Sequence, residues 1–97
     1  MNFVIAPKST EIQANWYDAK LYCFSLNIDG KVGWRLPTKD ELNQIYRVKN
    51  DFGRTYYWSY TEYDVSDVWL QNFGNGNQLS GNKSYGSLYV RAVRDIK

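Results

Sequence analysis

Cys23 has the most reactive side chain in this sequence, but the sequence offers it no catalytic partner. It is the only cysteine, and the 97-residue chain contains no histidine. A catalytic thiol needs a base that lowers its pKa, and a zinc site needs several cysteine or histidine ligands. Cys23 also falls on an apolar helical stripe, which is typical of a core thiol. We therefore predict no enzyme activity, no zinc site and no cofactor.

Carboxylates are the other groups that could carry chemistry. Glu62, Asp64 and Asp67 lie close together in the sequence and could supply oxygen ligands to calcium. Acidic residues in a loop are more often simply solvated. Ten acidic residues also always offer some pair that could be assigned to glycoside hydrolysis. We predict no metal ion, although the sequence leaves open whether Asp64 and Asp67 bind calcium.

Two segments have the composition of a binding surface. Tyrosines crowd residues 56–63, and asparagine, serine and glycine crowd residues 72–87. Antibody paratopes favour the same residue types, because rigid amphipathic rings and adaptable hydrogen-bonding groups suit many ligands. We predict that loops around residues 60–66 and 74–87 bind a protein or glycan through Tyr60, Tyr63, Asn75, Asn77, Asn82 and Tyr85. An equally supported alternative is that these segments are plain turns and that some tyrosines fill the core.

A Trp-Arg-Leu-Pro-Thr segment in the first half of the chain is predicted to serve structure rather than ligand binding. Its threonine is followed three residues later by a glutamate, which is the spacing of a helix capping box. Its tryptophan should fill the core beneath a sheet. Its arginine, if buried, needs a carboxylate or carbonyl partner, and two glutamates are candidates. The residues given a structural role are Trp34, Arg35, Thr38, Glu41 and Glu62.

Two helices are predicted from capping signals and apolar periodicity. Asn15 is a suitable N-cap, and apolar residues follow from Trp16 at spacings of three and four. The first helix should therefore run to about Asn27. The capping box that begins at Thr38 starts the second helix, which is predicted over residues 39–48.

The remaining segments favour β structure. Strands are predicted at residues 3–5, 56–62, 67–73 and 88–94. A return strand should start at residues 77–79 after an Asn-Gly turn, and a loop should follow over residues 80–87. Residues 8–14 are either a connection or a second short extended piece.

The last predicted strand alternates apolar and polar residues. Leu88, Val90 and Ala92 should face the core, and Tyr89 and Arg91 should face away from it. Helices early and antiparallel strands late predict a single α+β domain over residues 1–97, with two helices packed on an antiparallel sheet.

Composition argues against several classes of partner. The net charge is +2, from 12 basic and 10 acidic residues, and no basic cluster suggests nucleic acid. No stretch approaches the ~20 apolar residues of a membrane span. Residues 1–7 lack the pattern of a signal peptide. We predict a protein made in the cytoplasm, which either stays there or leaves as part of a virus particle.

The order of the motifs resembles a known family. The resemblance covers residues 16–94 and rests on the helix residues Trp16, Ala19 and Cys23 and on segments 33–42, 57–62, 68–69 and 90–94. Together they resemble the C-terminal domain of Legionella collagen-like adhesins, a domain found in bacteria and phages. They are more distantly similar to the formylglycine-generating enzyme superfamily. Both relatives imply a C-type-lectin-like fold.

This sequence departs from the family pattern in two ways. The resemblance implies a cysteine pair that joins the first helix to the last strand, but those positions are Cys23 and Ala92 here. Such a crosslink could contribute roughly 3–5 kcal/mol, so packing must replace it. Its loss suits a chain that folds in a reducing compartment. Position 60 is usually serine and is Tyr60 here. The activity of formylglycine-generating enzymes is not implied, because those enzymes use paired active-site cysteines.

These observations predict a non-catalytic binding module on a phage virion or a cell surface, with a receptor protein or a glycan as its ligand. The lack of a signal peptide pattern and of a disulfide favours the virion surface, since virions assemble in the cytoplasm. The alternative is a structural decoration or cement protein of a phage capsid or tail. Its aromatic residues would then pack on neighbouring subunits. Other virion subunits or further copies of the chain are the expected partners in the assembly.

Overall fold

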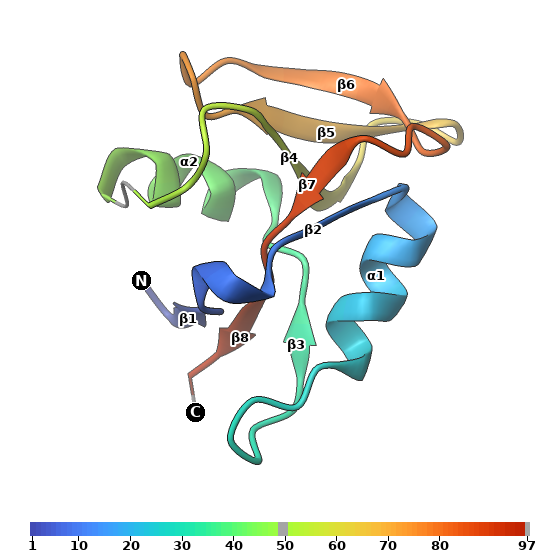
Figure 1. Cartoon of the computed structure of the whole chain (residues 1–97). Helices are drawn as coiled ribbons and strands as arrows, with labels where there is room; N and C mark the ends of the chain where they lie inside the picture. The colour runs from blue at the N-terminus through green and yellow to red at the C-terminus, as the bar shows by residue number, and fades with distance from the viewer. Residues whose placement is uncertain (49–50, 97) are drawn as a thin grey trace.

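The computed structural model describes residues 1–48 and 51–96, and Figure 1 shows the arrangement of its helices and strands. The order along the chain is β1 (Phe3–Ile5), a 3₁₀ turn (Lys8–Thr10), β2 (Ile12–Ala14), α1 (Trp16–Ser25), β3 (Trp34–Arg35), α2 (Lys39–Val48), β4 (Tyr56–Glu62), β5 (Asp67–Asn72), β6 (Gln78–Asn82), β7 (Leu88–Val90) and β8 (Val93–Asp95).

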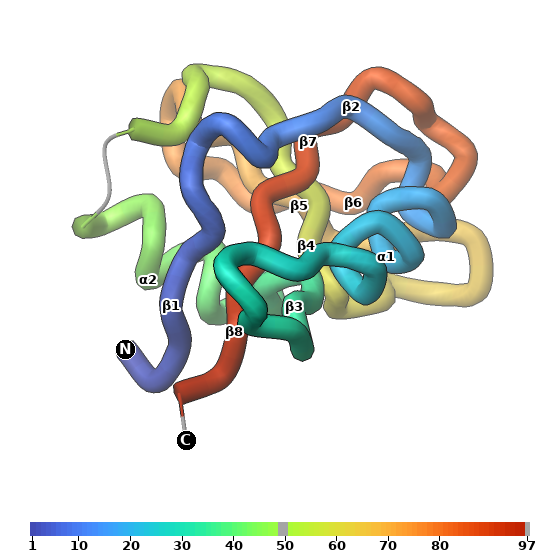
Figure 2. The backbone as a smooth tube through the Cα atoms, turned by 60° about the horizontal axis from the view of Figure 1, so that its bottom comes forward, coloured from blue at the N-terminus to red at the C-terminus, as the bar shows by residue number. Residues whose placement is uncertain are grey.

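The strands form two sheets. The larger has the order β2-β7-β4-β5-β6, and the smaller has the order β1-β8-β3. Strands β4 and β7 run parallel, and the other paired strands run antiparallel. Because β1 pairs with β8, the two ends of the chain lie side by side (Figures 1 and 2). The prediction of an α+β fold is confirmed, with a sheet that is mixed at one pairing. The C-type-lectin-like assignment stays a prediction.

The two helices pack against opposite faces of the larger sheet. Neighbouring residues of a strand point to opposite faces, and Trp58 belongs to the apolar cluster under α1 while Tyr57 belongs to the cluster under α2. The α1 cluster comprises Ala6, Trp16, Ala19, Cys23, Trp34, Leu36, Trp58, Val68, Leu70, Val90 and Ala92. The α2 cluster comprises Phe3, Leu42, Ile45, Phe52, Tyr57, Phe73 and Val93.

Both predicted helix starts are confirmed by hydrogen bonds. The Asn15 side chain accepts from the Asp18 backbone N–H at 2.8 Å. The Thr38 hydroxyl accepts from the Glu41 N–H at 3.2 Å, and the Glu41 carboxylate accepts from the Thr38 N–H at 2.9 Å, so the capping box is closed in both directions. Helix α2 has the predicted bounds. Helix α1 ends at Ser25, earlier than predicted, because the backbone is already extended at Leu26.

Two predictions about the C-terminal strands are wrong. The return strand β6 continues to Asn82, so the first residues of the predicted 80–87 loop are paired with β5. The predicted strand over residues 88–94 is two strands, β7 in the larger sheet and β8 in the smaller one. The chain crosses from one sheet to the other between Val90 and Val93.

This crossing also overturns the predicted orientation of Arg91, which is buried instead of facing away from the core. Alternation along a strand stops where the strand ends, so the side chain is free to turn inward. Its guanidinium donates to the Ala6 carbonyl at 2.6 Å, to the Glu11 carboxylate at 3.0 Å and to the Asp51 carboxylate at 3.0 Å. Glu11 also accepts from the Tyr57 hydroxyl at 2.7 Å. A charge at this depth persists only because it is paired.

Candidate functional site

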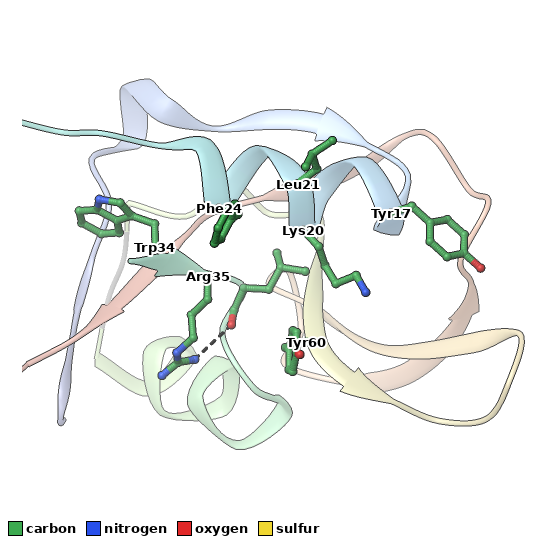
Figure 3. Close-up of a pocket in the computed structure, with 8 residues that line it drawn as sticks. Tyr17, Lys20, Leu21, Phe24, Trp34, Arg35 and Tyr60 are labelled. Atoms are coloured by element: carbon green, nitrogen blue, oxygen red, sulfur yellow. Dashed lines mark hydrogen bonds between the residues drawn. The ribbon is translucent and has the colours of Figure 1, made fainter. Parts of the chain in front are cut away.

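A groove of about 710 Å³ runs along helix α1, between the helix, strand β3 and the end of β4 (Figure 3). We call it the α1 groove. Its lining is mostly apolar and combines residues far apart in the sequence: Tyr17, Lys20, Leu21, Phe24, Trp34, Arg35, Leu36 and Tyr60.

Hydrogen bonds on both sides of β4 hold the walls of the α1 groove together. The Trp16 indole N–H donates to the Ser59 carbonyl at 2.9 Å, which ties α1 to β4. The Tyr60 backbone N–H donates to the Pro37 carbonyl at 2.7 Å, which ties β4 to the segment after β3. Leu36 is buried at the base of the groove. The groove is therefore built on rigid elements, which is the arrangement that suits a preformed binding site.

The upper wall of the groove is an exposed apolar stripe. Tyr17, Leu21 and Phe24 are 57%, 67% and 80% exposed. Sequence reasoning missed these residues, although a signal was present. Helix α1 carries two apolar stripes, one of which is buried at Trp16 and Cys23, and a surface helix needs only one to be held in the fold.

The lower wall includes Arg35, whose partners are largely those expected for a structural arginine. Its guanidinium forms a two-pronged contact with Glu41, at 2.7 and 2.9 Å. It also contacts the Asp95 carboxylate at 2.6 and 3.3 Å and the Leu36 carbonyl at 3.1 Å. These bonds use all five guanidinium N–H groups. The hydrogen bonds to Glu41 and then to Asp95 raise the pKa of Arg35.

The same contacts act on Glu41 in the opposite direction. Burial opposes ionisation of this carboxyl, but hydrogen bonds from Arg35 and from the Thr38 N–H outweigh it. The pKa of Glu41 is therefore lowered below its ordinary value. Of the two glutamates predicted as partners of Arg35, Glu41 is confirmed.

The prediction that Glu62 is a partner of Arg35 is wrong, because Glu62 instead accepts from the Lys83 ammonium at 3.4 Å. Lys83 joins three segments at this end of the sheet. Its ammonium donates to the Val65 carbonyl at 2.9 Å, and its backbone N–H donates to the Ser66 carbonyl at 3.0 Å. Its carbonyl accepts from the Trp16 N–H at the start of α1, at 3.0 Å. Loops 63–66 and 83–87 therefore lie beside each other and next to the first turn of α1.

The structure divides the residues predicted to bind ligand among three places. Tyr60 lines the α1 groove. Tyr63 and Tyr85 are exposed on the two adjacent loops, and Asn82 is the last residue of β6, where the second of these loops begins. Asn75 and Asn77 lie in the turn between β5 and β6, at the opposite end of the sheet. Figure 1 shows this turn on the side of α2.

The asparagines in these segments have turn-forming roles. The Asn75 side chain accepts from the Asn77 N–H at 2.9 Å. The Asn82 side chain accepts from the Ser84 N–H at 2.9 Å and from the Ser84 hydroxyl at 2.6 Å. Such side-chain oxygens replace backbone turn contacts. The side chains of Asn75 and Asn82 are thus used by their own turns, and the binding role of Asn75, Asn77 and Asn82 stays a prediction.

Asp64 is also used by its own turn. Its carboxylate accepts from the Ser66 N–H at 3.0 Å and from the Asp67 N–H at 2.7 Å. These backbone hydrogen bonds, from Asp67 first and then from Ser66, lower the pKa of Asp64. Within residues 1–48 and 51–96, no three histidine, cysteine or acidic side chains come together as a potential metal site.

The environment of Cys23 is that of a core thiol. The side chain is fully buried in the α1 cluster. Ala92, at the position where the family pattern has the second cysteine, is buried in the same cluster. Burial raises the pKa of the Cys23 thiol to about 12. A thiol that is neutral at physiological pH and closed off from solvent is a poor nucleophile.

The comparison with protein families agrees with the motifs and with the fold. The family model of the Lcl C-terminal domain matches residues 5–94, which includes every strand and helix except the first residues of β1 and the last residue of β8. No curated protein matches the chain. Neither of the two α-helices in the described part of the chain is long and apolar enough to cross a membrane. The match covers nearly the whole chain, so the protein belongs to the Lcl C-terminal domain family.

Proposed function

We propose that this adhesin-like domain is a non-catalytic module that binds a receptor protein or glycan, and that it is displayed on a phage virion or a cell surface. The observation that carries the proposal is the α1 groove, where Tyr17, Leu21, Phe24 and Tyr60 remain exposed around a preformed hollow. Large exposed apolar patches on small domains are typical of interaction sites.

The adjacent loops extend this surface. Lys83 connects loop 63–66 to the start of α1, so Tyr63 and Tyr85 stand near the Tyr17 end of the groove. Tyrosines are well suited to binding because their rings are large and lose little conformational freedom. We propose that the receptor contacts the groove first and these two tyrosines at its margin.

The absence of catalysis is part of the proposal. Its support is the state of Cys23, which is buried and has a pKa raised to about 12. The display on a virion is supported by Ala92, which stands where the family pattern has the second cysteine. Cys23 is thus left without a disulfide partner, which suits assembly in a reducing compartment.

The test is a binding measurement with the purified domain on a glycan array and on a panel of intact cells. Phe24→Ser and Tyr60→Ala should each weaken binding at least about tenfold, which is the size expected for aromatic residues central to an interface. The matched control is Tyr56→Ala, which removes an exposed tyrosine at the opposite end of β4. Unchanged binding by both groove variants would overturn the proposal.

A second measurement distinguishes receptor binding from the alternative of a structural decoration protein. If Tyr63→Ala and Tyr85→Ala reduce adsorption of intact particles, the loops serve the receptor. If the same changes yield fragile or incomplete particles, the loops contact neighbouring subunits and the domain is a cement protein.

A further inference from the structure

The chemistry of the α1 groove narrows the class of ligand that it can take. This inference rests on the proposed function, since it concerns the same surface. The apolar wall consists of Tyr17, Leu21 and Phe24 on one turn after another of α1, and Tyr60 faces it from β4 (Figure 3). A second, smaller hollow lies on the other side of Leu21 and is lined by Ile12, Ala14, Asp18, Tyr22 and Ser25. Leu21 therefore stands on a ridge between two depressions.

The exposed apolar area around the α1 groove is a large part of what one side of a protein interface buries. Taking ~150–250 Å² for a fully exposed aromatic side chain, the exposed parts of Tyr17, Leu21, Phe24 and Tyr60 add up to roughly 500 Å². A stable protein interface buries about 800 Å² on each partner. The four side chains thus supply more than half of one side of such an interface, and the loop tyrosines can supply part of the rest.

The polar groups of the groove disfavour a ligand made mostly of hydroxyl groups. All five N–H groups of Arg35 are already bonded to Glu41, Asp95 and the Leu36 carbonyl. Among the lining side chains, a sugar would find the Tyr17 and Tyr60 hydroxyls and the Lys20 ammonium to replace the water that its several hydroxyls lose, and the shortfall is costly. An apolar side chain loses nothing of this kind.

Two cations, Arg35 and Lys20, line the α1 groove. Among the described residues, Arg35 is paired with carboxylates and no ion pair of Lys20 is seen. The Lys20 ammonium sits 3.8 Å from the centre of the Trp16 ring, which fixes it on the wall of the groove. Figure 3 shows this side chain extending from α1 on the side of the helix where Tyr60 lies. A carboxylate that arrives next to an apolar side chain would meet the ammonium, and the two charges would attract.

We propose that the α1 groove binds a segment of a partner protein that inserts an apolar side chain between Phe24 and Tyr60 and sets an Asp or Glu side chain against Lys20. The apolar insertion provides most of the affinity. The carboxylate selects the segment against basic sequences, because a lysine or arginine in its place would face Lys20.

The experiment uses two blocked pentapeptides that differ only at the two charged positions, N-acetyl-Leu-Asp-Phe-Asp-Leu-amide and the same peptide with lysine in place of each aspartate. Each is titrated into the full chain labelled with nitrogen-15, and the backbone amide signals are followed by NMR. The acidic peptide should shift the signals of residues 17–24 and 34–36 and bind about three- to tenfold more tightly than the basic peptide.

Three variants make the result specific. Lys20→Glu should reverse the preference, so that the basic peptide binds more tightly. Phe24→Ser should weaken both peptides without altering the preference. Arg47→Glu makes the same charge change on exposed α2, outside the groove, and should leave both affinities unchanged. An unchanged pattern of amide signals in each free variant shows that it is folded.

Three outcomes would overturn the inference. Equal affinities for the two peptides, or no shift at the groove with either, would exclude selection of an acidic segment. Sedimentation that shows self-association of the chain, lost in Phe24→Ser, would assign the groove to a second copy. If peptide binding fails while Phe24→Ser still abolishes receptor binding on cells or glycans, the inference is wrong and the proposed function stands.

Discussion

Helices α1 and α2 each contain ten residues and each bury apolar residues against the larger sheet, but their outer sides differ. Helix α2 presents residues such as Gln44 and Arg47 to solvent. Helix α1 presents Tyr17, Leu21 and Phe24. One apolar face is enough to hold a helix on a core. The packing of this domain therefore accounts for most of the apolar residues of α2, with Val48 at its last position 69% exposed, and for only one of the two apolar stripes of α1.

The ionic contacts follow a similar division. The buried guanidinium of Arg91 lies against the Phe52 ring of the α2 cluster, 4.6 Å from its centre, and Arg35 reaches Glu41 on α2. One lysine on each helix meets an aromatic ring instead, Lys20 of α1 at Trp16 and Lys39 of α2 at Trp69. The arginine ion pairs therefore lie on the side of α2, whereas the outer side of α1 carries the exposed apolar stripe. Substitutions should mainly change stability on the side of α2 and binding on the outer side of α1.

The largest effect should come from Arg91→Met. This change removes the guanidinium from Glu11 and from the Ala6 carbonyl in the interior, and breaking a buried ion pair by removing one partner costs about 3–5 kcal/mol. The matched change on the outer side of α1, Lys20→Met, should stay within about 0.5 kcal/mol. Urea unfolding followed by tryptophan fluorescence measures both. Similar losses of unfolding free energy in the two variants would contradict the distinction between the side of α2 and the outer side of α1.

The next effect compares two leucines, one on each helix. Leu42 on α2 is 1% exposed, so Leu42→Ala should lower the free energy of unfolding by about 2–5 kcal/mol. Leu21 on α1 projects into solvent, so Leu21→Ala should change it by less than about 0.5 kcal/mol. The same unfolding measurement applies. A large loss in Leu21→Ala would mean that the outer face of α1 supports the fold and is not a free binding surface.

The features that sequence reasoning predicted correctly depend on neighbours along the chain. Thr38 and Glu41 are three residues apart, and their capping box set both the start of α2 and the position of the carboxylate that Arg35 meets. The N-cap at Asn15 is equally local. Such contacts are specified by spacing alone, because a helix start fixes the geometry of the residues around it.

The features that sequence reasoning missed depend on residues far apart in the chain. The break between β7 and β8 arises because β7 pairs with β2 while β8 pairs with β1 and β3. Arg91 and Glu11 are 80 positions apart. Alternation within residues 88–94 cannot reveal either fact. The sequence could have indicated one wall of the α1 groove, because Leu21 and Phe24 form a second apolar stripe on α1. It could not have indicated Tyr60, which joins them only through tertiary packing.

The smallest effect concerns the boundary between the two sides, where Arg35 holds Glu41 and Asp95. Glu41→Gln should lower the free energy of unfolding by about 1–2 kcal/mol at pH 7, because hydrogen bonds to a charged group are lost. The folded pKa of Glu41 lies below its ordinary value of about 4.3. Its ionic contribution is therefore complete above that pH and disappears as the pH falls through the lower folded value.

The difference between wild type and Glu41→Gln should accordingly shrink when unfolding is measured at pH 3 instead of pH 7. Asp95→Asn is the matched control on the same guanidinium, and its carboxylate is 56% exposed against 18% for Glu41. Exposed pairs contribute little, so Asp95→Asn should cost less than about 1 kcal/mol at either pH. Equal costs for the two carboxylates would show that Arg35 is not anchored mainly to α2. The lower wall of the groove would then be less firmly braced than the geometry of the Glu41 contact implies.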